Sequence, residues 1–204
     1  MMQSLFEEPS IKQVIPIDDG ELYLWHSLFS QHSASNLFSH LENSLKWSQD
    51  EITIRGRCVP VPRLQAWYGD SESHYAYSGI TLQPLEWTKE LLEIKQKIET
   101  ITGYHFNSVL ANYYRDGSDS VSWHQDNEPE LGANPIIASL SLGETRQFQL
   151  RHTSHKHETI KLNLPHNSLL VMAGAIQKKW LHQVTKTKKA VGPRINLTFR
   201  LIKH

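Results

Sequence analysis

Apolar residues recur at two different spacings along the chain, and the spacing changes near Gly103. Over residues 27–47 and 85–101 the apolar positions are mostly three or four residues apart, which is typical of a helix with one buried face. Gly103 directly follows the second stretch and is a common residue after a helix end. We therefore expect two packing helices over these two ranges.

Downstream of Gly103 the apolar and polar residues alternate, which is typical of strands with one buried face. The alternating runs cover residues 136–142, 148–150, 160–164, 169–171 and 195–201. Turn-forming residues separate them at Leu142-Gly143, Pro165-His166-Asn167 and Gly192-Pro193. The expected fold class is mainly β with flanking helices (α+β), in which antiparallel strands form a sandwich or barrel with the helices outside.

The last alternating run places four polar side chains on one strand face. This set is Arg194, Asn196, Thr198 and Arg200. The face could be an ordinary outward surface, or it could line a polar interior in which the two guanidinium groups bind an acidic ligand. Asn112 and Tyr114 likewise share one strand face and offer amide and phenol donors.

Residues 122–126 carry a spacing that suits a metal site. In an extended chain His124 and Asp126 lie on the same face, and together with a distant histidine they would form the two-histidine, one-carboxylate triad of non-haem iron enzymes. With 12 histidines in the chain, an isolated spacing of this kind also arises by chance. The order of the elements supports the metal interpretation, because His182 follows several strands later and precedes the arginine-bearing run.

Composition limits the classes of protein to consider. The chain has 204 residues, 39% of them apolar and 21% charged, so one domain with a sizeable core is expected rather than a disordered or fibrous protein. The single Cys58 excludes an internal disulfide and a cysteine-based zinc site. The first residues lack the features of a secretion signal, and no long apolar run is present. We expect a monomer without a membrane partner in the cytoplasm, and also in the nucleus if the source is eukaryotic.

The net charge of zero conceals an uneven distribution. Residues 1–53 hold eight acids and two bases, whereas residues 144–204 hold twelve Lys and Arg against Glu144 and Glu158. The carboxyl third could therefore present a basic face to a nucleic acid, or the lysines could simply form a solvated surface.

Four ordered motifs in this chain resemble the AlkB family of Fe(II)- and 2-oxoglutarate-dependent dioxygenases, particularly its nucleic-acid demethylase branch. The matching stretches span residues 112–117, 123–129, 135–143 and 193–200, and the resemblance runs from about residue 52 to residue 201. It implies a double-stranded β-helix (jelly-roll) core over residues 51–204, with a nucleotide-recognition lid at about 51–84. Residues 1–50 would form an amino-terminal lead-in packed on or flanking that core.

The resemblance also implies a role for each polar group named above. His124, Asp126 and His182 would hold Fe(II) and form the catalytic centre. Arg194 and Arg200 would bind the two carboxylates of 2-oxoglutarate, with further contacts from Asn112, Tyr114, Asn196 and Thr198.

The implied reaction is oxidative demethylation of N-alkylated bases such as 1-methyladenine and 3-methylcytosine. 2-Oxoglutarate and O₂ would be converted to succinate and CO₂, and the hydroxylated methyl group would leave as formaldehyde. The expected partner is alkylated DNA, with RNA as a further candidate. Two alternatives stay open: a dioxygenase of the same fold acting on a protein or other substrate, and a catalytically silent nucleic-acid-binding module.

Substrate contacts are expected in the lid and just after the first ligand pair. A base that leaves its stack needs aromatic and hydrogen-bonding partners, and the resemblance assigns these to Tyr68, Tyr75, Tyr77, Ser78, Asn127 and Glu128. Asn127 stands where close relatives carry Asp. Glu128 could accept a hydrogen bond from an exocyclic amine of adenine or cytosine.

The stretch Arg55-Gly56-Arg57 matches the position of a hairpin that probes the duplex in some relatives. Arg55 or its neighbour would fill the gap left by a flipped base, and Arg57 and Arg63 would contact phosphates. Without the family resemblance, the same residues would be interpreted as an ordinary basic turn with glycine at its tip. Since position 55 lacks a large apolar side chain, single-stranded or weakened substrate is expected at least as readily as intact duplex.

Overall fold

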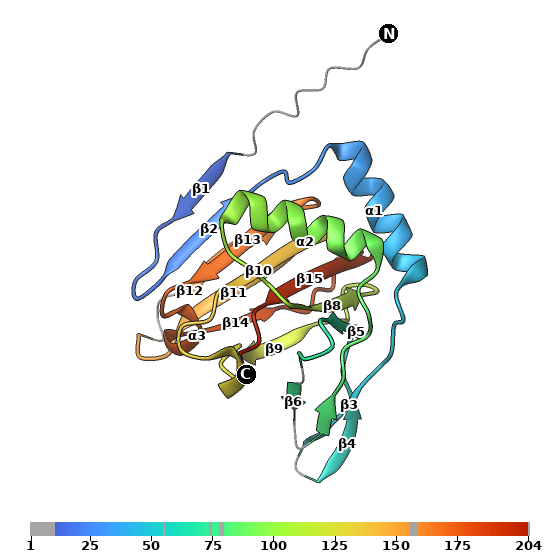
Figure 1. Cartoon of the computed structure of the whole chain (residues 1–204). Helices are drawn as coiled ribbons and strands as arrows, with labels where there is room; N and C mark the ends of the chain where they lie inside the picture. Colours follow the sequence, from blue (N-terminus) through green and yellow to red (C-terminus); the bar gives the residue numbers. More distant parts are fainter. Residues whose placement is uncertain (1–10, 55, 74, 78–79, 156–158, 204) are drawn as a thin grey trace.

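A computed structural model describes residues 11–203 apart from 55, 74, 78–79 and 156–158. Two antiparallel sheets form the body (Figure 1). The larger sheet has seven strands in the order β1 (Lys12–Ile15), β2 (Glu21–Trp25), β13 (Ser168–Ala173), β10 (Ile137–Gly143), β15 (Arg194–Arg200), β8 (Ser108–Tyr114) and β5 (Leu64–Gly69). The smaller sheet has four, in the order β12 (Thr159–Leu164), β11 (Arg146–His152), β14 (Trp180–Val184) and β9 (Val121–His124).

Two short hairpins and four helical segments complete the described chain. The hairpins are β3 (Glu51–Ile54) with β4 (Arg57–Pro60), and β6 (Tyr75–Tyr77) with β7 (Ile80–Leu82). The helical segments are α1 (Gln31–Ser44), α2 (Lys89–Thr102), the short α3 (Ile176–Lys179) and the 3₁₀ turn η1 (Pro129–Leu131). In Figure 1 the hairpin strands β3, β4 and β6 extend together from one end of the body.

Capping residues determine where the two long helices begin and end. The hydroxyl of Ser30 accepts the backbone N–H of Ser33 at the start of α1, and Thr88 does the same for Leu91 in α2. Gly103 ends α2 in the left-handed conformation, with φ of 74°. α1 lies within the predicted range 27–47, and α2 ends one residue beyond the predicted range 85–101, so the prediction of two helices is confirmed.

The larger sheet separates two apolar clusters. Its outer face packs against α1 and α2, where Leu41, Leu91 and Ile98 are buried against side chains such as Leu140 and Leu197. Its inner face packs against the smaller sheet. The molecule therefore has three layers, namely helices, the larger sheet and the smaller sheet, and the expected strand sandwich with helices outside is confirmed.

The orientation of β15 follows from these layers. Ile195, Leu197 and Phe199 point into the cluster beneath the helices, so the alternating polar residues point to the interior between the two sheets. All seven residues of β15 are buried. Of the two possibilities that the sequence leaves open for this polar face, the structure therefore selects the polar interior.

The described part of residues 1–50 packs on the core. β2 pairs with β13 and so extends the larger sheet, β1 pairs with β2 at its edge, and α1 covers the outer face. Among the described residues, no helix combines the length and the apolar character that crossing a membrane requires.

Candidate functional site

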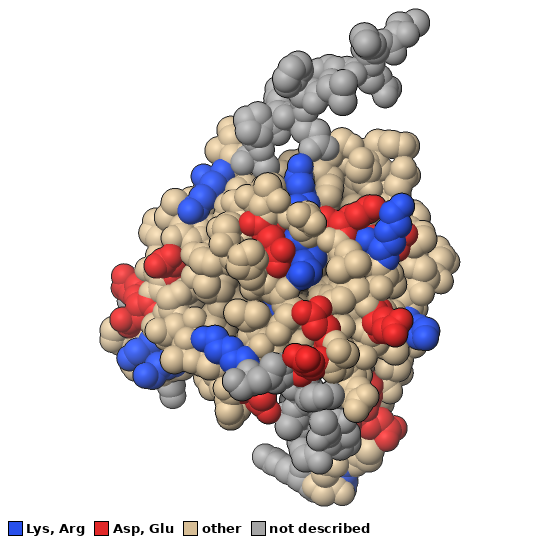
Figure 2. Space-filling model, in the orientation of Figure 1, with Lys and Arg blue, Asp and Glu red and all other residues tan. Residues whose placement is uncertain are grey.

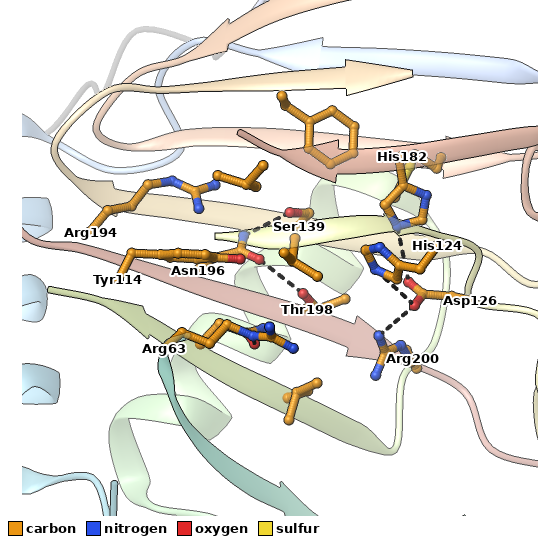
Figure 3. Close-up of a pocket in the computed structure, with 16 residues that line it drawn as sticks. Arg63, Tyr114, His124, Asp126, Ser139, His182, Arg194, Asn196, Thr198 and Arg200 are labelled. Atoms are coloured by element: carbon orange, nitrogen blue, oxygen red, sulfur yellow. Dashed lines mark hydrogen bonds and ion pairs between the residues drawn. The ribbon is translucent and has the colours of Figure 1, made fainter. Parts of the chain in front are cut away.

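A cavity of about 480 Å³, including its open mouth, lies between the two sheets. Its residues come from both layers, and Figure 3 shows how they are distributed. His124, His182 and Asp126 lie at one end together with Arg200, whereas Arg194 and Tyr114 lie at the other end. The remaining lining residues are Arg63, Leu110, Asn112, Val121, Ser139, Phe148, Met172, Val184, Asn196 and Thr198.

The three predicted metal ligands converge at one end of this cavity. His124 on β9 and His182 on β14 are paired directly across the smaller sheet, and their ring centres are 4.2 Å apart. Asp126 follows β9, and its two carboxylate oxygens each lie 3.9 Å from a histidine Nε2. One potential ligand atom from each residue lies within 4.8 Å of the others, so one metal ion fits between them.

An irregularity in β9 fixes the orientation of His124. The register between β9 and β14 shifts between the pairs His182–His124 and Val184–Val121, so β9 has one extra residue there. The carbonyl oxygen of Ser122 lies 2.8 Å from His124 Nδ1 and accepts its proton in the matching tautomer. This tautomer leaves the lone pair of Nε2 free on the side of Asp126, as a metal ligand requires.

Burial keeps the second histidine neutral. The pKa of His182 is lowered to about 3, first because burial disfavours the imidazolium form and then because His124 lies beside it, against the opposing effect of Asp126. Its Nδ1 is buried without a hydrogen-bond partner among the described residues. A neutral, desolvated imidazole beside a carboxylate is suited to metal coordination.

Asp126 is held from two directions. Burial by itself would raise its pKa, but Arg200 first, and then the neighbouring His182 and His124, lower it to about 2. Arg200 Nη2 donates to Asp126 Oδ1 at 2.8 Å. The backbone N–H of Asp126 donates to the side-chain oxygen of the buried Gln177 at 3.0 Å, so α3 helps to position the loop that carries the carboxylate.

The opposite end of the cavity holds a buried cation. Arg194 is 1% exposed, donates from Nη2 to Ser141 Oγ at 2.8 Å and lies 5.2 Å from the ring centre of Tyr114. Its Nε and Nη1 are buried without partners among the described residues. Burial lowers its pKa to about 10, so it stays charged at neutral pH. A buried guanidinium with unused donors favours a carboxylate ligand.

The polar groups between the two ends are largely bonded to each other. Asn196 donates to Ser139 Oγ and to the Leu140 carbonyl, and its own oxygen accepts from Thr198. The oxygen of Asn112 accepts from Arg63 and from Gln65. All the predicted co-substrate contacts therefore border the same cavity. The hydrogen bonds that orient Asn112, Asn196 and Thr198 are already formed within the protein.

These residues fit an iron ion and a dicarboxylate. The two histidines and one carboxylate match the ligand set of non-haem iron sites, and the donor-rich Arg194 lies across the same cavity. An iron ion would bind to the histidine and aspartate ligand atoms at one end. A carboxylate would bind to the unused donors of Arg194 at the other end.

The residues predicted to contact the substrate are not all placed where a base could reach them. Tyr68 is 3% exposed in the cluster beneath the helices, and its hydroxyl accepts the backbone N–H of Lys46. A base cannot reach a ring in that position, so the prediction that Tyr68 contacts the substrate is corrected. Tyr75 and Tyr77 are the two ends of β6, and Ser78 lies outside the described residues.

The other two predicted base contacts follow the ligand loop. Asn127 is exposed directly after Asp126. Glu128 is half-buried at the N-cap of η1, and its Oε2 has no hydrogen-bond partner among the described residues. A carboxylate oxygen with unused acceptor capacity suits the predicted bond from an exocyclic amine.

The predicted probing hairpin is present as β3 and β4. Gly56 has φ of 76° at its tip, a conformation that few residues other than glycine adopt. Arg57 is exposed at the start of β4, and Arg55 lies outside the described residues.

Several residues of the site were missed by the sequence reasoning. Ser139 and Ser141 alternate with Ala138, Leu140 and Leu142 along β10, and this pattern could have placed them on the same face as the site. Arg63 was expected at a phosphate but lines the cavity and donates to Asn112. Gln177 carries no sequence signal, because it approaches the site only through the fold.

Surface charge is mixed on the face shown in Figure 2, where basic and acidic side chains are interspersed. Of the bases in the carboxyl third, Lys178, Lys186, Lys188 and Lys189 are exposed. Arg146, Arg194 and Arg200 are buried, and the last two of these line the cavity. The basic surplus is therefore divided between the surface and the interior.

The family model described as 2OG-Fe(II) oxygenase superfamily matches residues 21–200 of this chain. The match covers all the cavity residues named above.

Curated relatives are similar over most of the chain. The protein named "Alpha-ketoglutarate-dependent dioxygenase alkB homolog 3" is 47% identical in Homo sapiens, over 92% of this chain and 68% of the relative, and 44% identical in Bos taurus, over 83% and 62%. "DNA oxidative demethylase ALKBH2" of Homo sapiens is 37% identical, over 86% of this chain and 71% of the relative. This chain thus spans about two thirds of the length of the two alkB homolog 3 proteins.

Solved structures support the architecture. The structure titled "The structure of OsALKBH1" superposes with a TM-score of 0.65 at 18% identity, covering 93% of this chain and all of the other. A prolyl hydroxylase in complex with a peptide fragment, from Trichoplax adhaerens, gives 0.62 at 14% identity, covering 91% of this chain and 84% of the other. The expected jelly-roll fold is therefore confirmed as the overall architecture of the chain.

Proposed function

The chain belongs to the 2OG-Fe(II) oxygenase superfamily, and from this membership we propose that it is an oxidative demethylase of N-alkylated nucleic-acid bases. The substrates proposed are 1-methyladenine and 3-methylcytosine in DNA, with RNA as a second substrate. The names of the relatives support this class, since one is a DNA oxidative demethylase and the other an α-ketoglutarate-dependent dioxygenase.

One observation carries the proposal: a single cavity joins a histidine, aspartate and histidine cluster to a buried guanidinium with unused donors. We assign Fe(II) to His124, Asp126 and His182. We assign the distal carboxylate of 2-oxoglutarate to Arg194 and Tyr114, and the carboxylate nearer the metal to the Arg200 side. Asn112, Asn196 and Thr198 border the chain of the co-substrate between the two ends.

When bound, Fe(II) and 2-oxoglutarate would supply the oxidising chemistry, in which O₂ and 2-oxoglutarate are consumed, succinate and CO₂ are released and the methyl group is hydroxylated. The protein does three things around this chemistry. Arg194 and Arg200 orient the co-substrate by charge-assisted hydrogen bonds. Apolar Leu110, Phe148 and Val184 line the cavity and limit water. Gln177 and Ser122 fix the orientation of two of the metal ligands.

The substrate base would enter after leaving its stack. We place Glu128 as acceptor for its exocyclic amine, because Oε2 has unused acceptor capacity. Asn127 adjoins it as an exposed polar contact, and the lid, at about residues 51–84, carries Tyr75, Tyr77 and Ser78 as the aromatic and hydroxyl contacts expected from the resemblance. The Arg55-Gly56-Arg57 tip would contact the nucleic-acid backbone.

The experiment is a demethylation assay on the purified chain. With Fe(II), ascorbate and 2-oxoglutarate, oligonucleotides that contain 1-methyladenine or 3-methylcytosine should lose one methyl group, as measured by mass spectrometry, with equimolar formaldehyde and succinate. His124→Ala is the control and should give no product. Oligonucleotides that stay methylated after incubation with fully iron-loaded protein would contradict the proposal.

Assembly and location belong to the same proposal. We propose that the chain acts as a monomer in the cytoplasm, and in the nucleus if its source is eukaryotic. Its mass in solution, measured by light scattering with and without a methylated oligonucleotide, tests the first part.

A further inference from the structure

A second buried arginine lies behind the Arg194 end of the cavity. Arg146 begins β11 in the smaller sheet, is 3% exposed and points to the interior between the sheets. Its guanidinium lies 5.6 Å from the ring centre of Tyr114, and the guanidinium of Arg194 lies 5.2 Å from the same ring centre. Tyr114 therefore contacts a cation from each of the two sheets.

Arg146 also joins two loops. Its Nη1 donates to the Asp116 carbonyl at 3.0 Å, and its Nη2 donates to the carbonyls of Asp119 at 2.8 Å and Thr185 at 2.7 Å. These carbonyls belong to the loops that follow β8 and β14. One side chain thus connects both loops at the end of the cavity where Arg194 lies.

The charge of Arg146 is only partly balanced. Among the described residues its hydrogen bonds go to backbone carbonyls, and neither it nor Arg194 forms an ion pair with a carboxylate. Asp119 accepts two bonds from Arg115 instead. Burial lowers the pKa of Arg146, and Asp119 and Asp116 oppose this effect. Two buried guanidinium groups near one ring create a region that favours an anion.

We infer that Arg146 is a positioning residue that makes the cavity selective for a dicarboxylate co-substrate, acting through Tyr114 and Arg194. It does not line the cavity. Its charge adds to the attraction for the distal carboxylate, and its contact with Tyr114 keeps the phenol ring against Arg194. This inference rests on the proposed function, because it assumes that the cavity binds 2-oxoglutarate.

The test compares two acids that differ in the distal carboxylate. Binding of 2-oxoglutarate and of 2-oxobutyrate, which lacks that group, is measured by calorimetry in the absence of O₂ with Mn(II) in place of iron. Wild type should prefer 2-oxoglutarate. Arg146→Met should reduce this preference about tenfold or more, because it removes the support for the hydrogen bonds from Arg194 to the distal carboxylate, and hydrogen bonds to charged groups are worth at least such a factor. Affinity for 2-oxobutyrate should stay close to wild type.

Two variants separate charge from loop structure. Arg146→Lys keeps the charge and should retain most of the preference. Arg115→Met removes a cation that holds the same loop through Asp119. Among the described residues the guanidinium groups over the Tyr114 ring are those of Arg146 and Arg194, not that of Arg115, so this variant should leave the preference unchanged. If Arg146→Met fails to fold, as judged by circular dichroism, Arg146→Gln replaces it, because glutamine keeps one donor for the loop carbonyls.

The outcomes distinguish the inference from the function on which it rests. Equal weakening of both acids in Arg146→Met, or an unchanged preference, would overturn the role of Arg146. Wild type that binds neither acid would instead contradict the co-substrate site itself. If Arg115→Met lost the preference for 2-oxoglutarate to the same extent as Arg146→Met, the effect would come from the structure of the loop. That result would also overturn the inference.

Discussion

Asp126 combines three interactions in one buried residue. Its carboxylate lies 3.9 Å from each histidine Nε2, its Oδ1 accepts from Arg200 at 2.8 Å, and its N–H donates to Gln177. The first interaction is needed only for a metal, whereas the other two are structural. Changing the charge while keeping the shape therefore separates metal binding from folding.

We expect Asp126→Asn to fold and to lose metal. Because an amide is a neutral and weaker ligand than a carboxylate, affinity for Mn(II) should fall by about a hundredfold or more, beyond the 10 to 100-fold typical of losing an outer partner. Calorimetric titration with Mn(II) measures the change, and circular dichroism checks the fold. Wild-type affinity in a folded variant would remove Asp126 from the ligand set.

Individual residues show what the sequence could predict about the site. His124 and Asp126 are recognisable because their spacing within an extended chain places them on one face. Arg146 and Gln177 are not, because each reaches its partner across a sheet or from a later helix, and no local pattern records that proximity. Tyr68 was expected to contact the base because the resemblance places it in the lid, but its strand, β5, belongs to the larger sheet.

At the scale of elements, the four-residue helix α3 is placed where it can support the metal site. Its Gln177 is buried and accepts the Asp126 N–H at 3.0 Å. Gln177→Leu would leave that N–H without its acceptor, at a cost of about 1–3 kcal/mol in the free energy of unfolding. We also expect Mn(II) affinity to fall 10 to 100-fold, as is typical for outer partners of a ligand.

Gln183→Leu is the matched control for this substitution. Gln183 is half-buried on the adjacent strand β14, where it donates to Gln149 at 2.8 Å, and it does not contact the ligand loop. Its replacement should leave Mn(II) affinity unchanged in calorimetric titration. Equal losses of affinity in the two variants would mean that α3 has no specific role.

A hydrogen bond between α1 and β8 predicts a dependence of stability on alkaline pH. Tyr113 donates to Glu42 Oε1 at 2.6 Å, and burial, followed by Glu42, raises the Tyr113 pKa from its ordinary value of 10 to about 12. The folded state therefore keeps the phenol proton after the unfolded chain has lost it. Stability from this group is complete below pH 10 and is lost as the pH rises from about 10 to 12.

We expect Tyr113→Phe to be less stable than wild type at pH 8 and to lose less stability between pH 8 and pH 11. Urea unfolding at both pH values measures the difference, and subtracting the two proteins removes the titration of other groups. Glu42→Gln should reduce the alkaline loss because it removes the negative charge beside the phenol. Parallel losses in wild type and Tyr113→Phe would contradict the assignment.

The strands illustrate which elements a pattern can predict. β15 alternates strictly, so its two faces were separable, although the layer that each face meets depends on the helices. β2 was not predicted, because Leu22 and Leu24 face one apolar cluster while Tyr23 and Trp25 face the other, which removes the alternation. Where both faces of a strand are buried, periodicity carries little information.

At the scale of the whole molecule, the distribution of charge has two separate consequences. The acidic amino-terminal residues offset the basic carboxyl third in the total, yet two of the three buried arginines of that third, Arg194 and Arg200, line the cavity. Only the exposed lysines remain for a phosphate backbone. Binding to nucleic acid should therefore be moderate and sensitive to salt, and access to the base depends more on the hairpin than on charge.

We expect the β3–β4 hairpin to influence which strand state is preferred. Its second strand exposes Arg57, Cys58 and Val59 and carries no aromatic side chain, and position 55, outside the described residues, is basic. Because a flipped base costs a few kcal/mol unless an apolar wedge replaces it, single-stranded substrate should react about tenfold or more faster than duplex. Competition between the same lesion in both forms measures the ratio by mass spectrometry.

Arg55→Phe tests the physical reason for that preference. A phenyl ring at the hairpin tip could occupy the gap in the base stack, so the rate on duplex should rise while the rate on the single strand stays the same. Arg57→Ala, two positions away, removes a cation without adding a wedge and should slow both substrates alike. Equal rates of wild type on the two forms, or no gain on duplex in Arg55→Phe, would show that strand opening does not limit this enzyme.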